Sequence, residues 1–260
     1  MVETLRRNKY ALIAVAVVLL LLGAWELIAR IIGSSVVLPT FSSVATEFFG
    51  LFTTGTFYAS LFSTLLRCLI GYCIGFVLGV ALGISAGKSK GFSAAMRPIN
   101  AVMRATPVAA LVLLLYIWVG SNVLPSVIGI MLVFPIIYEH IKTATENIDP
   151  ALCDVLDEMG SGFFHSARTV YLPLTLPHAL SSVSATFGMN LKAVITAEVL
   201  ASSVPSIGRQ IYFANQNLVY DVSRLFAWVV VAVLLSVLFE TILRSIITKL
   251  TNRISWLGIR

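Results

Sequence analysis

Long apolar runs with few or no charged residues dominate this sequence, and they constrain its fold more than any other feature. The first run, ALIAVAVVLLLLGAWELI, occupies residues 11–28. The whole chain is 58% hydrophobic and only 12% charged, whereas about a quarter of a soluble domain is charged. Because about 20 apolar residues in a helix span the hydrocarbon core of a bilayer, the sequence predicts an all-α integral membrane protein. Its 260 residues leave no block for a soluble catalytic domain.

The apolar runs divide the chain into six expected transmembrane helices. The first could be a cleaved signal peptide, but the run is longer than the core of such a peptide and no A-x-A site follows it. We therefore interpret it as a membrane helix. The expected transmembrane helices are 10–30, 61–87, 105–119, 123–141, 174–200 and 225–247, the last five of them within a transmembrane domain at 57–248.

Basic residues set the expected orientation of these helices. Lys and Arg cluster on one side, which the positive-inside rule places in the cytoplasm. This side holds the termini, 1–9 and 249–260, and the loop 142–173. Residues 33–60 contain no Lys or Arg, so 31–60 is expected to be external and to include a short interfacial helix. The net charge of +6 is then explained by topology, without nucleic acid.

Motifs for catalysis or metal binding do not occur in the sequence. The stretch GISAGKS, residues 83–89, resembles a phosphate-binding loop, but Leu82 stands where that motif needs its first glycine. The three cysteines form no C-x-x-C pair, and the three histidines are scattered. We therefore predict a chain that is not an enzyme and binds no metal or cofactor of its own.

Glycine recurs every fourth residue along the second expected span. In a helix this spacing forms a smooth stripe, which lets two helix backbones approach closely in lipid. The partner helix could belong to the same chain or to a second subunit, and we favour the same chain. The stripe contains Gly71, Gly75, Gly79, Gly83 and Gly87.

The fifth expected span is unusually polar. Ionisable groups at membrane depth usually face a protein interior or a wet cavity, so this helix is the candidate for a substrate pathway. For Lys192, snorkelling or pairing with an acid is the alternative; Glu198 could lie at the interface, Arg67 could snorkel and Arg104 could cap a helix. The candidate pathway residues are Ser184, Asn190, Lys192 and Glu198.

A polar segment interrupts the apolar pattern at 149–173. Asp149-Pro150 is a typical helix start, and an apolar face then recurs through Leu152, Val155, Leu156 and Met159. Gly160 is expected to end this helix in the left-handed conformation. Ser161 then begins a second short helix, which Pro173 ends.

This segment resembles the cytoplasmic signature of binding-protein-dependent ABC transporter permeases. The family pattern is Glu-Ala-Ala, three residues, Gly, nine residues, Ile, one residue and Leu-Pro. Here Gly160, Val170 and Leu172-Pro173 keep the spacing, while Asp154, Val155 and Leu156 replace Glu-Ala-Ala. The resemblance implies that the segment docks on an ATPase, through Asp154, Val155, Leu156, Asp157, Glu158, Met159, Gly160, Ser161, Gly162, Leu172 and Pro173.

Several other stretches resemble the nitrate/sulfonate/taurine branch of that family, among them VVLPTFSSV, RATPVAALVLLLYIWVG and TAEVLA. The resemblance implies a type I ABC importer permease with six transmembrane helices, in a bacterial-type plasma membrane. It implies as partners a second permease subunit (a homodimer is favoured), an ATPase dimer that binds ATP-Mg, and an extracytoplasmic binding protein. The expected substrate is a nitrate-, sulfonate- or taurine-type anion. The alternatives are a pyrimidine or vitamin precursor, an ion-coupled secondary transporter, and a structural membrane subunit.

Overall fold

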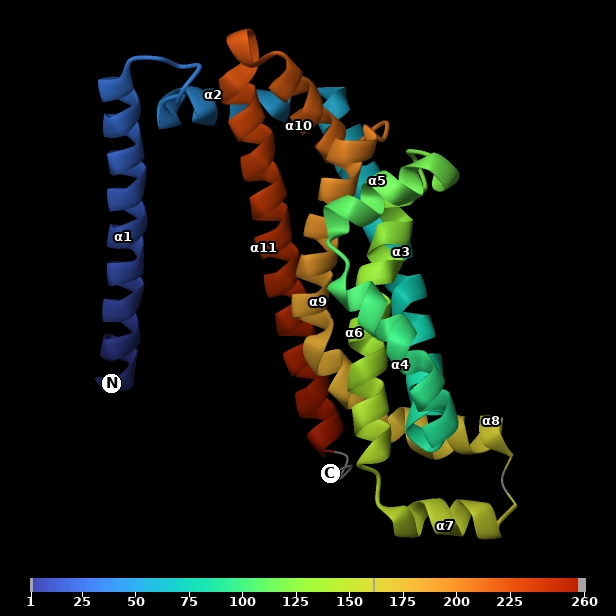
Figure 1. The fold of residues 1–260 in the computed structure, drawn as a ribbon. Helices are drawn as coiled ribbons and strands as arrows, with labels where there is room; N and C mark the ends of the chain where they lie inside the picture. Colours follow the sequence, from blue (N-terminus) through green and yellow to red (C-terminus); the bar gives the residue numbers. More distant parts are fainter. Residues whose placement is uncertain (1, 161, 257–260) are drawn as a thin grey trace. The chain divides into compact units, whose positions relative to one another are not determined.

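The computed structural model describes residues 2–160 and 162–256, and every regular element in these ranges is helical. The chain divides into two compact units, 1–58 with 210–231 and 59–209 with 232–260. The first unit contains α1 (Val2–Ile32), α2 (Phe41–Leu51), most of α10 (Ile207–Gln216) and the start of α11 (Leu218–Trp256). The second contains the remaining helices, which Figure 1 shows in the colours of the sequence.

In the first unit, hydrogen bonds fix the corner between α1 and α2. The indole nitrogen Nε1 of Trp25 donates to the carbonyl of Pro39 at 3.1 Å, and the carboxylate of Glu26 accepts from the backbone N–H of Ser42 at 3.2 Å. The hydroxyl of Thr40 caps α2 by accepting from the N–H of Ser43. A short helix therefore does form in the segment 31–60.

Four of the described helices are long and apolar enough to cross a membrane: residues 12–32 and 222–249, all of α3 (Gly55–Lys88) and all of α6 (Leu124–Glu146). A bent pair, α4 (Lys90–Ala105) and α5 (Val108–Val119), would make a fifth span. The helix α9 (Leu172–Ala201) covers the expected fifth span but is not apolar enough to meet the same criterion. Its polar residues are the reason.

The region of the third expected span differs from the sequence interpretation. The expected transmembrane helices 61–87 and 105–119 leave the residues between them outside any helix, but Lys90–Ala105 forms α4, whose N-cap Ser89 accepts from the N–H of Phe92. Pro107 holds the preceding residue, Thr106, in an extended conformation. The chain therefore bends by 103° between α4 and α5. The sequence did contain a signal for α4, because Phe92, Met96 and Met103 share one helical face; these side chains pack against α6.

The glycine stripe of α3 lies directly against α6 of the same chain. A Cβ atom added at Gly79 would stand 2.8 Å from Cβ of Ile137, and one at Gly75 would stand 3.0 Å from Cβ of Val133. Each of the five glycines meets an α6 atom in this way. The two helices are therefore in close contact at five glycines, which span four successive repeats of four residues.

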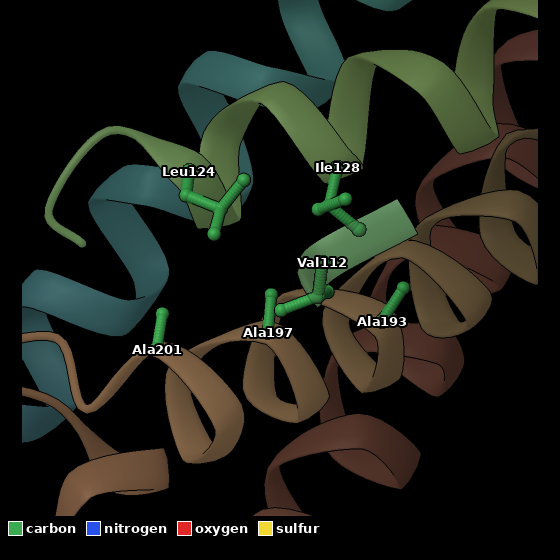
Figure 2. Close-up of a cluster of buried hydrophobic side chains, with 6 residues drawn as sticks. All are labelled: Val112, Leu124, Ile128, Ala193, Ala197 and Ala201. Atoms are coloured by element: carbon green, nitrogen blue, oxygen red, sulfur yellow. The ribbon is translucent and has the colours of Figure 1, made fainter. Parts of the chain in front are cut away.

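On another side, α6 packs against α9 and α5 through small and branched apolar residues. Figure 2 shows these side chains pointing toward one another from the three helices. Alanines on α9 allow its backbone to come close to α6, as small residues do in membrane bundles. The cluster contains Val112, Leu124, Ile128, Ala193, Ala197 and Ala201.

A buried ion pair joins α3 to α9. The guanidinium Nη1 of Arg67 lies 3.1 Å from Oε1 of Glu198, and Glu198 has no exposed side-chain surface. Glu198 also accepts from the hydroxyl of Thr64 at 2.9 Å and from the N–H of Gly208 at 3.3 Å. The sequence suggested that Glu198 could lie at the interface and that Arg67 could snorkel, and in the structure the two side chains pair with each other. This pairing could not be seen beforehand, because the partners are 131 residues apart.

Arg67 also connects three loop carbonyls to this pair. Its Nε donates to Asn122 at 3.1 Å, Nη1 to Pro205 at 2.8 Å and Nη2 to Val204 at 3.2 Å. One side chain thus ties α3 to the α5–α6 turn and to the connection after α9. A buried charge is tolerated when its partners satisfy it in this way.

We predict that Gly79→Ala destabilises the chain by about 1–3 kcal/mol, the usual cost of overpacking a well-packed contact. The added methyl has no room beside Ile137. Thermal unfolding of the purified chain in detergent is the measurement. Gly23→Ala in α1 is the matched control, because nothing lies within 4 Å of its Cβ position. Equal effects of the two substitutions would contradict the close contact.

We predict that Arg67→Gln costs about 3–5 kcal/mol of stability, as expected when one partner of a buried pair is removed. Glu198→Gln should cost less, because its amide oxygen can still accept from Thr64 and Gly208. The double variant should be no less stable than Arg67→Gln, since the two effects are coupled. Denaturant unfolding measures all three, with the exposed Arg97→Gln as control. Additive losses would show that the two side chains act independently.

Candidate functional site

The polar segment after α6 forms a separate helix, α7 (Pro150–Glu158), which lies across the end of the second unit's helices (Figure 1). The carboxylate of Asp149 accepts from the N–H of Ala151 at 2.9 Å and caps it. Gly160 has φ +62°, a conformation that costs a residue with a Cβ. The helix thus starts and stops where the sequence predicts.

The apolar face of α7 is largely unpartnered in the single chain. Leu156 is buried, but Val155 is 50% exposed and Met159 is 73% exposed. Glu158 and Gly162 are also exposed. Ser161 and the side chains of Asp154 and Asp157 lie outside the described part of the structure. Exposed apolar side chains beside polar ones are typical of a surface that binds another protein.

The second short helix of this segment does not end at Pro173. Helix α8 (Phe163–Ser166) continues through the π-helical turn η1 (Ala167–Tyr171) into α9. Leu172 and Pro173 are the first two residues of α9, and the N–H of Leu172 donates to the carbonyl of Ala167 in η1. The chain from Phe163 to Ala201 is therefore one helical path with a local widening, and a short connection that includes Gly160 and Gly162 joins it to α7.

Seven exposed residues form a stripe along α9, at intervals of three or four. The remaining faces are largely covered by the chain itself. Exposed residues on α3, such as Leu66, Ile70 and Val77, are apolar and suit lipid. The α9 stripe is different, because four of its seven residues are polar. It consists of His178, Ser181, Ala185, Met189, Lys192, Thr196 and Leu200.

A cavity of about 650 Å³ opens between α6, α7 and α9 at one end of this stripe. His178 and Ser181 of the stripe line it together with His140 and Thr143 of α6. The ring nitrogen Nδ1 of His140 lies 2.9 Å from the hydroxyl of Ser182, so the wall of this cavity is hydrogen-bonded. Asp149 and Leu152 also line it, which brings the start of α7 to the same opening.

A second cavity, of about 290 Å³, lies at the bend between α4 and α5. Its walls include Arg104 and Thr106 from the bend and Met189 from the stripe. Non-helical backbone at membrane depth is tolerated where it lines a cavity or is buried in protein. Arg104, which the sequence suggested as a helix cap, thus lines a cavity that reaches the middle of α9.

The structure separates the four candidate pathway residues. Lys192 is exposed on the stripe, whereas Ser184, Asn190 and Glu198 are buried within the chain. Asn190 donates through Nδ2 to the carbonyl of Cys68 at 3.0 Å, so in this conformation it joins α9 to α3. His178, Ser181 and Thr196 were missed as candidates, although their spacing from Lys192 by 14, 11 and 4 residues was a signal.

The comparisons with known proteins agree on the family and on the fold. The family model described as "binding-protein-dependent transport system inner membrane component" matches residues 75–256, well over half of the chain. The search of curated proteins found no match to this chain.

Among solved structures, the chain is similar to the MetNI methionine ABC transporter in an inward-facing conformation, with a TM-score of 0.62 and 17% identity over 75% of this chain and 95% of that one. It is also similar to a bacterial ABC transporter for import of the acidic polysaccharide alginate, with a TM-score of 0.63 and 16% identity over 94% and 97%. An amino acid ABC transporter gives 0.59 and 15% over 75% and 93%. At these identities the likeness shows the type I permease fold alone.

The residues matched by the family model include the glycine stripe from Gly75 onward, α7 and the whole of α9. The chain therefore belongs to the family of binding-protein-dependent transport system inner membrane components, the membrane subunits of ABC importers.

Proposed function

We propose that the chain carries a small anion of the nitrate, sulfonate or taurine type across the plasma membrane, along the polar stripe of α9. A second copy of the chain would complete the pathway, and an extracytoplasmic binding protein would deliver the substrate. ATP-Mg would be bound and hydrolysed by a separate ATPase that docks on α7. Membership of this family argues against the alternative of an ion-coupled secondary transporter.

The observation that carries this proposal is the polarity of the exposed α9 stripe. His178 and Lys192 would be costly against lipid tails, whereas the hydroxyls of Ser181 and Thr196 donate to the backbone carbonyls of His178 and Lys192. The two cavities at His178 and at Met189 adjoin the same stripe. A water-filled path along α9 accounts for all three features, whereas a structural subunit would give no reason for them.

Lys192 supports the choice of an anion. It is the one residue of the stripe that carries a fixed positive charge at neutral pH, and it stands among small or uncharged neighbours. Two copies of the chain related by symmetry would place two lysines along one pathway. Positive side chains lining a pore select anions, so a neutral pyrimidine or vitamin precursor is the weaker candidate.

Coupling to the ATPase is supported by the exposed apolar face of α7 and by the helical path that leads from α8 through η1 into α9. Val155 and Met159 offer apolar surface, while the cap at Asp149 and the left-handed Gly160 hold both ends of the helix. A movement of α7 would be transmitted through α8 and η1 to the stripe. Such a two-state element, biased by a partner at one end, is the usual basis of transporter switching.

We predict that Lys192→Met lowers uptake of the anion about tenfold or more, since a hydrogen bond to a charged group contributes about 1.5–3 kcal/mol. Lys192→Arg keeps the charge and should retain most of the uptake. The measurement is binding-protein- and ATP-dependent uptake of labelled taurine, nitrate or an alkyl sulfonate into proteoliposomes. If a neutral pyrimidine is taken up equally by wild type and Lys192→Met, the anion assignment is wrong.

We predict that Val155→Asp reduces co-purification of the ATPase about tenfold or more, because the new carboxylate would be desolvated against an apolar partner surface. The side chain is exposed in the single chain, so the chain itself should fold normally. Val155→Ala, which restores the residue that the family pattern has there, is the matched control and should retain the complex. Full recovery of the ATPase with Val155→Asp would show that docking occurs elsewhere.

A further inference from the structure

An apolar groove with a volume of about 560 Å³ lies on the outside of the second unit, away from the α9 stripe. The inner half of α3 forms one wall, with Val77, Val80 and Ala81. The other wall is formed by Phe164 of α8, Ala167 of η1 and Leu176 of α9. Its volume is within the range of about 300–1,000 Å³ that is usual for small-molecule sites.

The lining of this groove is apolar apart from one charged residue, Arg168. Ile84 is buried at the groove, while Val77 is 63% exposed and Phe164 is 80% exposed. A membrane helix that presents Val77 and Ala81 outward faces acyl chains rather than water. The groove therefore has the polarity of a site for hydrocarbon, unlike the two cavities along the polar stripe.

The positive charge of the groove comes from Arg168, which lies in η1. Arg168 is exposed and has no hydrogen-bond or ion-pair partner among the residues that the structure describes. Lys88 ends α3, and its ammonium lies 4.7 Å from the centre of the Tyr171 ring, one helical turn from Arg168. Arg168 thus lines the apolar groove, and Lys88 at the end of α3 is a second cation, which contacts the next helical turn.

We propose that this groove binds a phospholipid with an anionic headgroup. One acyl chain would lie between α3 and α9 over Val80 and Ala81, and the headgroup phosphate would accept hydrogen bonds from Arg168. A guanidinium fork matches the oxygens of a phosphate. Basic pockets between membrane helices are suited to anionic lipid headgroups. The lipid would then contact both α3 and η1, the turn through which α7 continues into α9.

Charge complementarity favours a lipid over a second copy of the chain as the occupant. A partner helix would have to place an acidic side chain at Arg168, but the exposed membrane surfaces of α3 and of α11 from Ala232 to Leu238 are apolar. An anionic lipid supplies both the hydrocarbon and the negative charge in one molecule, and the membrane holds it at high local concentration.

The test is lipid binding to the purified full-length chain in detergent, measured by native mass spectrometry with dioleoyl phosphatidylglycerol and dioleoyl phosphatidylcholine. Wild type should retain phosphatidylglycerol in preference to phosphatidylcholine. Arg168→Gln should lower that preference about fivefold, because one basic residue at a membrane surface contributes about 1 kcal/mol. Arg97→Gln removes an exposed charge on α4 that does not line the groove, and it should leave the preference unchanged.

A groove-filling variant tests the site of the acyl chain. Ala81 is exposed on α3, so Ala81→Trp fills the groove without entering the packed interior, and it should lower retention of both lipids. Unchanged retention in this variant, or an unchanged preference in Arg168→Gln, overturns the proposal. It is also overturned if Ala81→Trp leaves lipid retention intact and converts a dimer to a monomer in the same spectra, because the groove would then be a contact between copies.

Discussion

The rest of the second unit depends on the contact between the glycine stripe of α3 and α6. Apolar helices in a bilayer gain little from burying apolar surface, because lipid tails are equally apolar, so close packing has to hold them together. Because α3 has glycine at five positions spaced by four residues, it comes near enough for Ile137 and Ile141 to pack against its backbone. The helix α6 is thereby held in the middle of the unit, and α4, α5 and α9 are positioned against it.

That arrangement explains how one helix can be both structural and functional. Most of α9 is covered, by alanines against α6 and by Asn190 and Glu198 against α3. The remaining narrow face is presented outward with a lysine, a threonine, a serine and a histidine on it. Because the buried faces fix the rotation of the helix, the polar face stays outward on the second unit. The C-terminal end of α9 is fixed further by Arg67, which binds Glu198 and three loop carbonyls.

Residue periodicity in the sequence predicted much of this structure, and its failures have specific physical causes. The helix of the polar segment was found because Asp149-Pro150 and Gly160 are strong local signals. The helix α4 was missed because its apolar face is short and its charges resemble those of a loop. Pro173 was interpreted as a stop, although proline in the first turn of a helix is compatible with continuation. The pairing of Glu198 was missed because local sequence carries no information about a partner on α3.

The sequence by itself determined that the chain enters a membrane, that it is helical, where α7 begins and ends, and which family it resembles. These properties depend on composition, on spacing within a few turns, and on residues that act locally. Only the tertiary structure decided which face of α9 stays open, that Arg67 and Glu198 form a buried pair, and that an apolar groove with a basic end lies between α3 and η1. Each of these requires residues far apart in the chain to meet, and helical periodicity does not specify which helix packs against which.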